Sequence, residues 1–507
     1  MRLDEVLTGV ETLSGRGDLS VQITGVTNDS RQVKPGDLFV SIQGFKKDGH
    51  SFISEAVRRG AVGIVAEKPL QVSLNLPLIL VTSGRHALAQ ISTNFYGHPS
   101  RKLRVIGVTG TNGKTTTTYL IETILSRAGF RTGLIGTIAY KINGKSYPAG
   151  RTTPESVELQ ALLREMVDAG VQYVVMEVSS HALSLDRVTG CDFDVAVFTN
   201  ATHDHFDFHG TFENYLEAKT RLFTNLSTGA KPSPHAVLNL DDPSAFHIQR
   251  KLPPGVKLLT YGIENDSAQF KAKRESWNAH GTQIRLSTPN GERELTLRIP
   301  GLFNIYNALA AISAAEACNI DLTLASTAIK EFYGVPGHYE YVDVGQDFFV
   351  MIDFAHNPAA LKNILMMAGE ITPSGKRIVV FGAEGAKDRL KRPVMGAVAA
   401  SYSDWAIITS DNLYGEDPWN IAREVERGLL EAGPPRLGYE VIVDRRVAIE
   451  RALAAASPGD IVIIAGKGHE TAQIVGDQSI PFNDRQVVEE ILTRFWRQSA
   501  AVHGAVP

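Results

Sequence analysis

The Gly-rich stretch Thr109-Gly110-Thr111-Asn112-Gly113-Lys114-Thr115-Thr116-Thr117 is the feature that most constrains the fold of this chain. It stands between an apolar run at 103–108, which predicts a strand, and a segment of helical periodicity at 114–130. Glycines let backbone amides curl around phosphate oxygens, and the following helix presents its positive N-terminus to them. Lys114 can neutralise the β- and γ-phosphates, and the Thr115 hydroxyl can reach Mg²⁺. The strict pattern needs a glycine where Val108 stands, so we predict a variant phosphate loop in a parallel α/β sheet.

The chain length and the Gly- and Pro-containing breaks between segments predict three domains. The chain has 507 residues, and domains average roughly 150 residues. Strand-like and helix-like segments alternate along the chain, so the fold class is α/β. We expect a small α/β domain at 1–100 and a central parallel-sheet domain at 101–334, which carries the phosphate loop and extra antiparallel strands at 265–298. A doubly wound, Rossmann-like domain is expected at 335–507.

Composition excludes several classes of protein. Lys and Arg number 51 against 55 Asp and Glu, a net charge of −4, so no broad basic surface predicts nucleic acid as a partner. Cys191 and Cys318 are too few for a disulfide framework and lack the paired spacing of a zinc site. The chain starts with Met1-Arg2-Leu3-Asp4-Glu5, which places acidic residues where a signal peptide needs a basic and then an apolar stretch. No run of apolar residues reaches the ~20 that are needed to cross a bilayer. We therefore expect a cytoplasmic protein without membrane insertion.

Two polar segments follow predicted strands of the central sheet, where α/β proteins place their ligands. Glu177 ends one strand, and a stretch at 200–209 with three histidines and two aspartates follows the next. This stretch is one residue off the metallo-hydrolase signature His-x-His-x-Asp-His, and the phosphate loop favours Mg²⁺ over Zn²⁺. Histidines that only cap neighbouring elements remain an alternative. Lys219 lies in a helical segment with both charge signs, which by itself predicts a solvated helix face.

Together these segments resemble the Mur ligase family, and most closely its MurE branch, which adds the third residue to UDP-N-acetylmuramoyl-L-Ala-D-Glu. The resemblance covers nearly the whole chain and implies an ATP-dependent, ADP-forming amide ligase of peptidoglycan precursor synthesis. Its three domains would bind uridine, ATP and an amino acid in turn. Besides the phosphate loop, the motifs that carry it are Asp29-Ser30-Arg31-Gln32-Val33-Lys34-Pro35-Gly36-Asp37-Leu38-Phe39, Asp48-Gly49-His50-Ser51-Phe52-Ile53, Asp353-Phe354-Ala355-His356, Lys391-Arg392-Pro393, Asp411-Asn412 and Gly466-Lys467-Gly468-His469-Glu470.

The resemblance also implies roles for individual residues. ATP would be held by Gly110, Thr111, Asn112, Gly113, Lys114, Thr115, Thr116, Asn304, Asn307, His338 and Asp353. The UDP-linked dipeptide would contact Ser30, Phe45, Lys46, Lys47, Thr152, Thr153, Ser179 and Arg187. The incoming diamino acid would contact Lys387, Asp411, Asn412, Tyr414, Gly466 and Glu470. Mg²⁺ would be bound by Thr115, Glu177, His205 and Lys219, the last as a carbamate, and the implied catalytic residues are Lys114, Lys219, Glu177 and His205.

Four positions depart from the family's pattern. His338 stands where the family has an Arg near ATP, and an imidazole is a weaker phosphate partner than a forked, permanently charged guanidinium. Tyr414 and Lys387 replace two arginines that meet meso-diaminopimelate, and Leu185 replaces a more usual Gln. Nearby acids such as Glu416 could instead meet the side-chain amine of L-Lys or L-ornithine. The added diamino acid therefore stays open between meso-diaminopimelate and L-Lys.

These departures keep two other functions in view. One is a diverged paralogue that uses the same ATP-dependent amide chemistry on another acid and amine. The other is a protein that binds a nucleotide without catalysis, because His338 weakens the phosphate site. A zinc hydrolase is the least favoured of the alternatives, since the phosphate loop has no role in that chemistry.

Overall fold

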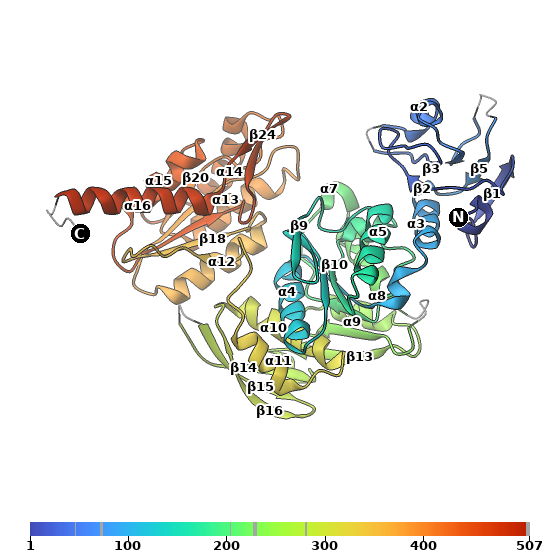
Figure 1. Cartoon of the computed structure of the whole chain (residues 1–507). Coiled ribbons are helices and arrows are strands. Elements are labelled where there is room, and N and C mark those ends of the chain that lie inside the picture. Colours follow the sequence, from blue (N-terminus) through green and yellow to red (C-terminus); the bar gives the residue numbers. More distant parts are fainter. Residues whose placement is uncertain (46, 71–74, 203, 227–230, 279–280, 503–507) are drawn as a thin grey trace.

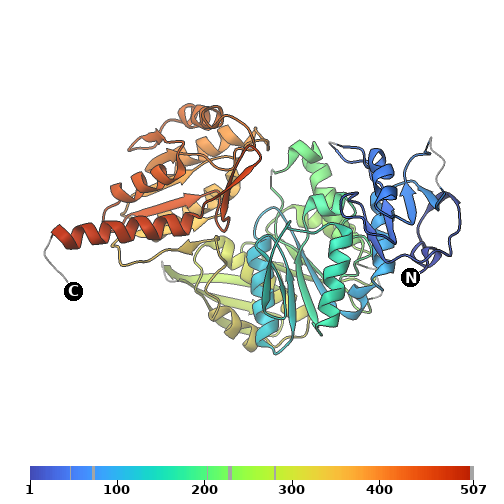
Figure 2. The same ribbon diagram turned by 45° about the horizontal axis from the view of Figure 1, so that its top comes forward.

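Three β-sheets organise the molecule, and they lie in a row with the sheet that carries the phosphate loop in the middle (Figures 1 and 2). The computed structural model describes residues 1–45, 47–70, 75–202, 204–226, 231–278 and 281–502. The alternation of strands and crossover helices confirms the predicted α/β class. In the described part of the chain, no helix is both long and apolar enough to cross a bilayer.

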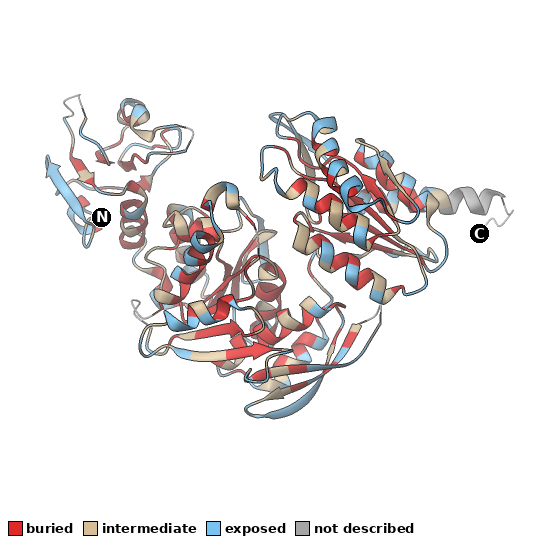
Figure 3. Ribbon diagram, turned by 180° about the vertical axis from the view of Figure 1, so that it is seen from behind, coloured by how far each residue is buried: buried red, intermediate tan, exposed pale blue. Residues whose placement is uncertain are grey.

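The N-terminal sheet has the strand order β1-β5-β4-β3-β2. Its strands pair in parallel except β1, which runs antiparallel to β5 and is exposed along its whole length (Figure 3). The strands are β1 (Thr12–Arg16), β2 (Gly25–Thr27), β3 (Asp37–Val40), β4 (Gly63–Ala66) and β5 (Leu78–Val81), and the helices are α1 (Leu3–Val6), α2 (Ile53–Arg58) and α3 (Gly84–Phe95), with 3₁₀ turns η1 (Gly49–Phe52) and η2 (Pro99–Lys102).

The central sheet has the order β16-β15-β14-β13-β12-β11-β6-β10-β7-β8-β9, and its inner strands are parallel. Most residues of these strands are apolar and buried, as expected for parallel strands whose two faces are both covered by helices. The strands are β6 (Arg104–Thr109), β7 (Thr132–Ile135), β8 (Ala139–Ile142), β9 (Lys145–Pro148), β10 (Tyr173–Glu177), β11 (Val195–Phe198), β12 (His235–Asn239), β13 (Lys257–Gly262), β14 (Phe270–Asn278), β15 (Gly281–Thr288) and β16 (Gly291–Leu297).

Helices α4 (Lys114–Arg127), α10 (Leu302–Ala317) and α11 (Leu322–Lys330) pack on one face of this sheet. The remaining helices of this region are α5 (Ser156–Asp168), α6 (Ser180–Ser184), α7 (Phe206–His209), α8 (Phe212–Thr224) and α9 (Ser244–Arg250). The polar segment 265–298 forms the antiparallel strands β14 to β16, as predicted. The antiparallel hairpin of β8 and β9 was not predicted from the sequence, although Asn-Gly is a strong hairpin signal. In the structure Asn143 and Gly144 form its turn, with φ of 48° and 80°.

The C-terminal sheet has the order β17-β18-β22-β19-β20-β21, with only β17 antiparallel. Apolar residues of α12, α13 and α14 pack on one face and those of α15 and α16 on the other, so the domain is doubly wound. Its strands are β17 (Glu340–Tyr341), β18 (Phe349–Asp353), β19 (Arg377–Phe381), β20 (Trp405–Ile408), β21 (Tyr439–Val441) and β22 (Ile461–Ala465), followed by the hairpin β23 (Ala472–Val475) and β24 (Gln478–Pro481). Its helices are α12 (Pro358–Ile371), α13 (Lys391–Tyr402), α14 (Pro418–Ala432), α15 (Arg445–Ala455) and α16 (Asp484–Val502).

Candidate functional site

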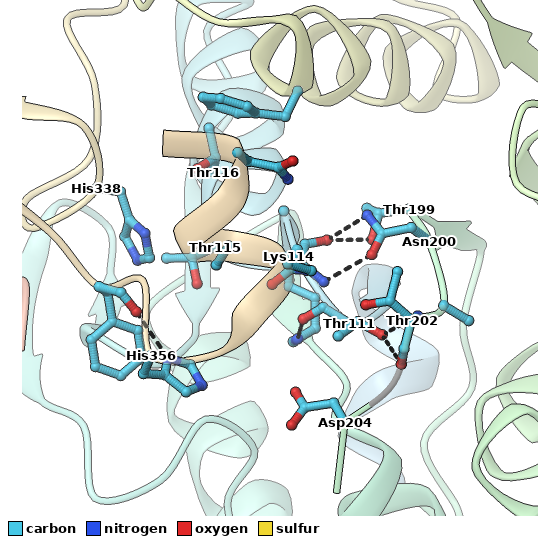
Figure 4. Close-up of a pocket in the computed structure, with 18 of the residues that line it drawn as sticks. Thr111, Lys114, Thr115, Thr116, Thr199, Asn200, Thr202, Asp204, His338 and His356 are labelled. Carbon is cyan, nitrogen blue, oxygen red and sulfur yellow. Dashed lines mark hydrogen bonds between the residues drawn. The ribbon is translucent and has the colours of Figure 1, made fainter. Parts of the chain in front are cut away.

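The phosphate loop lies between β6 and α4 and is tied to the end of the neighbouring strand β11 (Figure 4). The amide of Thr111 donates to the carbonyl oxygen of Asn200 at 2.8 Å, and the amide of Asn112 donates to the Asn200 side chain at 3.0 Å. The Thr199 hydroxyl donates to the carbonyl oxygen of Asn112 at 2.7 Å. These bonds hold the loop against the end of β11.

Two glycines of the loop cannot be replaced without a clash. Gly110 and Gly113 have φ of 152° and 85°, and a Cβ there would meet the Thr199 hydroxyl and the Asn307 side-chain oxygen respectively. Lys114 curls back over the loop, where its Nζ donates to the carbonyl oxygens of Gly110 at 2.9 Å and Thr111 at 2.8 Å. Burial lowers the pKa of the Lys114 amine, and the carboxylates of Glu177 and Asp204 oppose this effect.

Glu177 closes β10 next to the phosphate loop and is fully buried. Its carboxylate accepts hydrogen bonds from the Thr115 hydroxyl at 3.0 Å, from the Thr137 amide at 2.8 Å and from the Thr137 hydroxyl at 3.1 Å. Burial raises the pKa of Glu177, and the positive charge of Lys114 lowers it. The predicted metal ligands Glu177 and Thr115 are therefore in direct contact.

His205 and its neighbour Asp204 face the loop from the segment after β11. His205 has φ of 55°, and its Nε2 lies 3.7 Å from an Asp204 carboxylate oxygen. Burial would raise the pKa of Asp204, but the cations around it, His205 first, lower it overall. Asp204 was not singled out from the sequence, although it stands beside His205 in the polar stretch. Residue 203 of that stretch lies outside the described residues.

Lys219 is buried, so the solvated helix face that its local pattern predicted is wrong. The side chain projects from α8 with 1% exposure, and its Nζ lies 4.3 Å from the centre of the Tyr215 ring. Burial lowers the pKa of the Lys219 amine well below its usual value, and the charge of Lys114 lowers it further. Burial thus favours the uncharged form of this amine over the ammonium.

A cavity of about 1000 Å³ joins the phosphate loop to the C-terminal domain. Its wall includes the predicted residues Thr111, Asn112, Gly113, Lys114, Thr115, Thr116, Thr152, Glu177, Ser179, His205, Asn307, His338, Asp353 and Lys387. Asn304, a predicted ATP contact, is fully buried instead. Its side-chain Nδ2 donates to the carbonyl oxygen of Pro300 at 2.7 Å, and its Oδ1 accepts from the Asn307 side chain at 3.1 Å. It positions Asn307 rather than lining the cavity.

Residues missed by sequence reasoning also line this cavity. They are Thr137, Tyr306, Asp241 and Phe303 from the central domain, with Asn363 and Glu384 from the C-terminal domain; His356, from the motif at 353–356, lines it too. Figure 4 shows His338 and His356 on one side of the loop and Thr199 and Asn200 on the other. Most of these residues come from different elements, so no local sequence pattern brings them together.

The connection to the C-terminal domain places His338 and Asp353 at the cavity. Burial lowers the pKa of His338 to about 3, with smaller contributions from His469 and His356. The buried Asp353 accepts a hydrogen bond from the Tyr339 amide at 2.8 Å, and burial raises its pKa to about 7. His338 is therefore neutral near pH 7, which differs from the permanent charge of an arginine at this position.

The predicted dipeptide contacts gather beside Glu177. The Thr153 hydroxyl donates to the carbonyl oxygen of Glu177 at 2.9 Å and accepts from the Ser179 amide at 3.1 Å. Arg187 donates to the carbonyl oxygen of Thr153 at 3.4 Å. Thr152 and Ser179 line the cavity, whereas Thr153 and Arg187 lie behind its wall.

The predicted uridine contacts lie in the N-terminal domain, apart from this cavity. The Ser30 hydroxyl is buried and donates to Glu55 at 2.9 Å. Phe45 is 76% exposed and reaches the central domain, where its ring lies 5.7 Å from that of Phe208. Lys47 is exposed in the same loop, and Lys46 lies outside the described residues.

Among the predicted amino-acid contacts, Lys387 lines the cavity, whereas Asp411, Asn412, Gly466 and Glu470 form a charged cluster at the carboxyl ends of β20 and β22. The buried Lys467 donates to the Asn412 side-chain oxygen at 3.1 Å and to Glu470 at 2.5 Å, and Asn412 donates to Glu470 at 2.9 Å. Asp411 lies 4.0 Å from Lys467. Gly466 has φ of 114°, and a Cβ there would lie 2.6 Å from Asp411, so the cluster also requires this glycine.

Tyr414 and Lys387 lie together at the edge of this cluster. The Lys387 Nζ is 5.6 Å from the centre of the Tyr414 ring. Burial and then the charge of Glu384 raise the pKa of Tyr414 to about 12, so its hydroxyl stays protonated as a donor. Glu416, which could have met a side-chain amine, is engaged by the buried Arg392 at 3.0 Å.

The donors at the phosphate loop fit Mg²⁺ better than Zn²⁺. Within the described residues, no group of three or more His, Cys, Asp and Glu side chains is arranged to hold a metal ion. Mg²⁺ keeps several waters and binds through one or two carboxylates together with substrate phosphates, whereas a structural Zn²⁺ needs a complete protein cage. The buried Glu177 carboxylate, in contact with the Thr115 hydroxyl, is a donor set that suits Mg²⁺.

A phosphate-loop domain joined to a doubly wound domain, with one cavity between them, defines an α/β protein of the nucleotide-dependent class. Residues 108–315 match the Mur ligase middle domain, residues 339–468 match the "Mur ligase, glutamate ligase domain", and residues 22–96 match the "Mur ligase family, catalytic domain". The chain belongs to the Mur ligase family and, within it, to the MurE branch, which confirms the resemblance seen in the sequence. The domain boundaries near residues 100 and 334 stay predictions.

Similar proteins cover almost the whole chain. A UDP-N-acetylmuramoyl-L-alanyl-D-glutamate--2,6-diaminopimelate ligase of Caldanaerobacter subterraneus subsp. tengcongensis is 44% identical, over 97% of this chain and 99% of that protein. The protein of the same name from Geobacillus thermodenitrificans is 46% identical over 92% of this chain and 94% of its own. A solved structure of a ligase with this name has 30% identity and a TM-score of 0.69, and covers 98% of this chain and 99% of its own.

Proposed function

We propose that this chain is an ATP-dependent ligase that joins meso-diaminopimelate to the γ-carboxylate of D-Glu in UDP-N-acetylmuramoyl-L-Ala-D-Glu, in peptidoglycan precursor synthesis. The observation that carries the proposal is the 44% identity, over 97% of the chain, to a ligase of that name. The phosphate loop, Glu177 and the buried Lys219 support it, because they supply the groups that phosphoryl transfer to a carboxylate requires.

The first step makes the carboxylate reactive. A carboxylate and an amine do not condense at neutral pH, so the γ-carboxylate of D-Glu attacks the γ-phosphorus of ATP, the bond to the β–γ bridging oxygen breaks, and ADP leaves. Lys114 moves from the loop carbonyls to the β- and γ-phosphates and offsets the charge of two anions brought together. Thr152, Thr153, Ser179 and Arg187 orient the acceptor dipeptide.

Mg²⁺ would be held by Thr115, Glu177, His205 and a carbamate on Lys219, and it would neutralise phosphate charge. The neutral amine of Lys219 adds to CO₂ and loses one proton, which gives a carbamate anion. Its burial supports this proposal, because the low pKa leaves a lone pair available at Nζ.

The second step forms the amide. The free amine of the diamino acid attacks the acyl phosphate, inorganic phosphate leaves, and the ammonium proton is lost. Asp411, Asn412 and Glu470 bind the ammonium group that stays at the distal centre, and Gly466 leaves room for the Asp411 carboxylate. Lys387 and Tyr414 bind the distal carboxylate with one charge and one hydroxyl donor, in place of two guanidinium forks. The reaction takes place in the cytoplasm, where ATP and the UDP-linked precursor are available.

The test measures ADP release with Mg²⁺, ATP and UDP-N-acetylmuramoyl-L-Ala-D-Glu in parallel reactions with meso-diaminopimelate, L-Lys, L-ornithine or no amine. Turnover that needs both the dipeptide and meso-diaminopimelate supports the proposal. If only L-Lys supports turnover, the amino acid that is added is L-Lys and not meso-diaminopimelate. If none of the amines supports turnover, a diverged paralogue is favoured. As a control, Lys114→Ala should be inactive with each amine.

A further inference from the structure

Three guanidinium groups meet at the junction of the N-terminal and central domains. Arg187 pairs with Glu155 at 2.9 Å, and Arg151 pairs with the same carboxylate. Arg85, from the first turn of α3, lies over the Phe45 ring at 5.7 Å from its centre. None of the contacts in the described parts of the chain pairs Arg85 with a carboxylate.

Positive charge exceeds negative charge at this junction. Burial lowers the pKa of Arg187, Glu155 partly restores it, and the like charges of Arg151 and Arg85 lower it further. The Nε of Arg187 is buried without a hydrogen-bond acceptor. Asp186, the other acid here, lies 3.9 Å from His86. Two of the three guanidinium groups therefore share the Glu155 carboxylate, and the Arg187 Nε is left as a donor for an anion.

The surroundings of Arg85 connect the two predicted parts of the substrate site. Phe45, which is predicted to contact the UDP part of the substrate, lies edge-on to Phe208, and the Phe208 ring lies 4.3 Å from the His181 ring. His181 lines the cavity beside Ser179, and the charge of Arg187 acts on it. A substrate that extends from Phe45 to Ser179 thus passes Arg85.

We propose that Arg85 binds the diphosphate of the UDP-linked substrate, with the surplus positive charge of Arg151 and Arg187 beside it. The assignment rests on the proposed function for the identity of the ligand. The UDP part of that substrate carries a diphosphate, and Arg85 lies next to Phe45, a predicted contact of the UDP part, whereas the dipeptide is expected at Thr153 and Ser179. A planar guanidinium with free donors matches phosphate oxygens.

The experiment titrates UDP and, separately, uridine into the full-length protein and its variants by isothermal titration calorimetry. Arg85→Gln should weaken UDP binding about tenfold or more, the loss of one charge-assisted hydrogen bond, and leave uridine binding unchanged. Arg85→Lys should lose less UDP affinity than Arg85→Gln, because lysine keeps the positive charge. The matched control is Arg16→Gln, which removes an arginine from the exposed strand β1 of the same domain and should bind UDP as the wild type does.

Steady-state kinetics add an independent readout. Arg85→Gln should raise the KM for the UDP-linked dipeptide about tenfold and leave the KM for ATP unchanged. Equal UDP affinity for wild type and Arg85→Gln overturns the assignment of Arg85 and leaves the proposed function standing. A wild-type protein that binds no UDP overturns the proposed function itself, and the assignment of Arg85 with it.

Discussion

The ion pair between Arg445 and Asp484 gives the sharpest prediction about how the C-terminal domain holds its site. Neither side chain has exposed surface, and the guanidinium donates to both carboxylate oxygens at 2.8 and 2.7 Å. The same guanidinium donates to the carbonyl oxygens of Ala465 at 3.0 Å and Ser410 at 3.4 Å, which precede Gly466 and Asp411. Arg445 therefore clamps together the two strand ends that carry the predicted amino-acid contacts.

Arg445→Met should leave Asp484 as a buried, unpaired carboxylate and destabilise the domain by about 3–5 kcal/mol. With a urea dependence of about 2 kcal/mol/M, the unfolding midpoint should fall by about 2 M. Tryptophan fluorescence can follow this transition, because three of the four tryptophans, Trp405, Trp419 and Trp496, belong to the last third of the chain.

The double variant Arg445→Met/Asp484→Leu supplies the control. It removes both charges and leaves only two carbonyl oxygens without a donor, at about 1 kcal/mol each. It should therefore be more stable than Arg445→Met alone, with a coupling energy of about 2 kcal/mol or more. A loss below about 1 kcal/mol in Arg445→Met, or strict additivity in the double variant, would refute the reasoning.

Further predictions concern the phosphate site. Lys114→Ala should abolish ADP release with an unchanged circular dichroism spectrum, and ligation at the wild-type rate would contradict the phosphate-loop assignment. Lys219→Ala should regain part of its activity in acetate or formate, which can replace the carbamate, whereas Lys114→Ala should not. His338→Arg should lower the melting temperature of the free protein by a few degrees, because it buries a charge, and Mg²⁺ with ATP should reverse this loss. Asp353 has a folded pKa of about 7, above its unfolded value, so its contribution to stability is greatest at low pH and is lost as pH rises from about 4 to 7. Asp353→Asn should therefore gain stability relative to wild type over that range, and parallel unfolding curves against pH would exclude this explanation.

Much of the fold could be predicted because its elements have strong periodic patterns. The helical periodicity at 114–130 predicted a helix that is α4, and the polar alternation at 265–298 predicted the antiparallel strands. The phosphate loop and Glu177 could be placed together because the carboxyl ends of neighbouring parallel strands share one edge of the sheet.

The rest of the site depends on tertiary packing that local patterns do not encode. Lys219 is buried because the face of α8 that carries Tyr215 and Lys219 turns toward the phosphate loop, although charges of both signs surround Lys219 in the sequence. Asn304 turns into the core and holds Asn307. Arg85 stands more than a hundred residues before Arg187, and only the docking of the two domains brings their charges together.

The predicted amino-acid contacts all lie on loops of the C-terminal sheet, so that sheet is a separable acceptor module. Loops after β19, β20 and β22 carry Lys387, Asp411 and Glu470, and none of these loops contributes to the phosphate loop or to the Glu177 network. With the roles proposed above, substitutions in these loops change which amine is accepted while the activation of the carboxylate continues unaltered. In such a chain a few loop changes would give the cell wall a new cross-linking residue, and Tyr414 and Lys387, in place of two arginines, are changes of that kind.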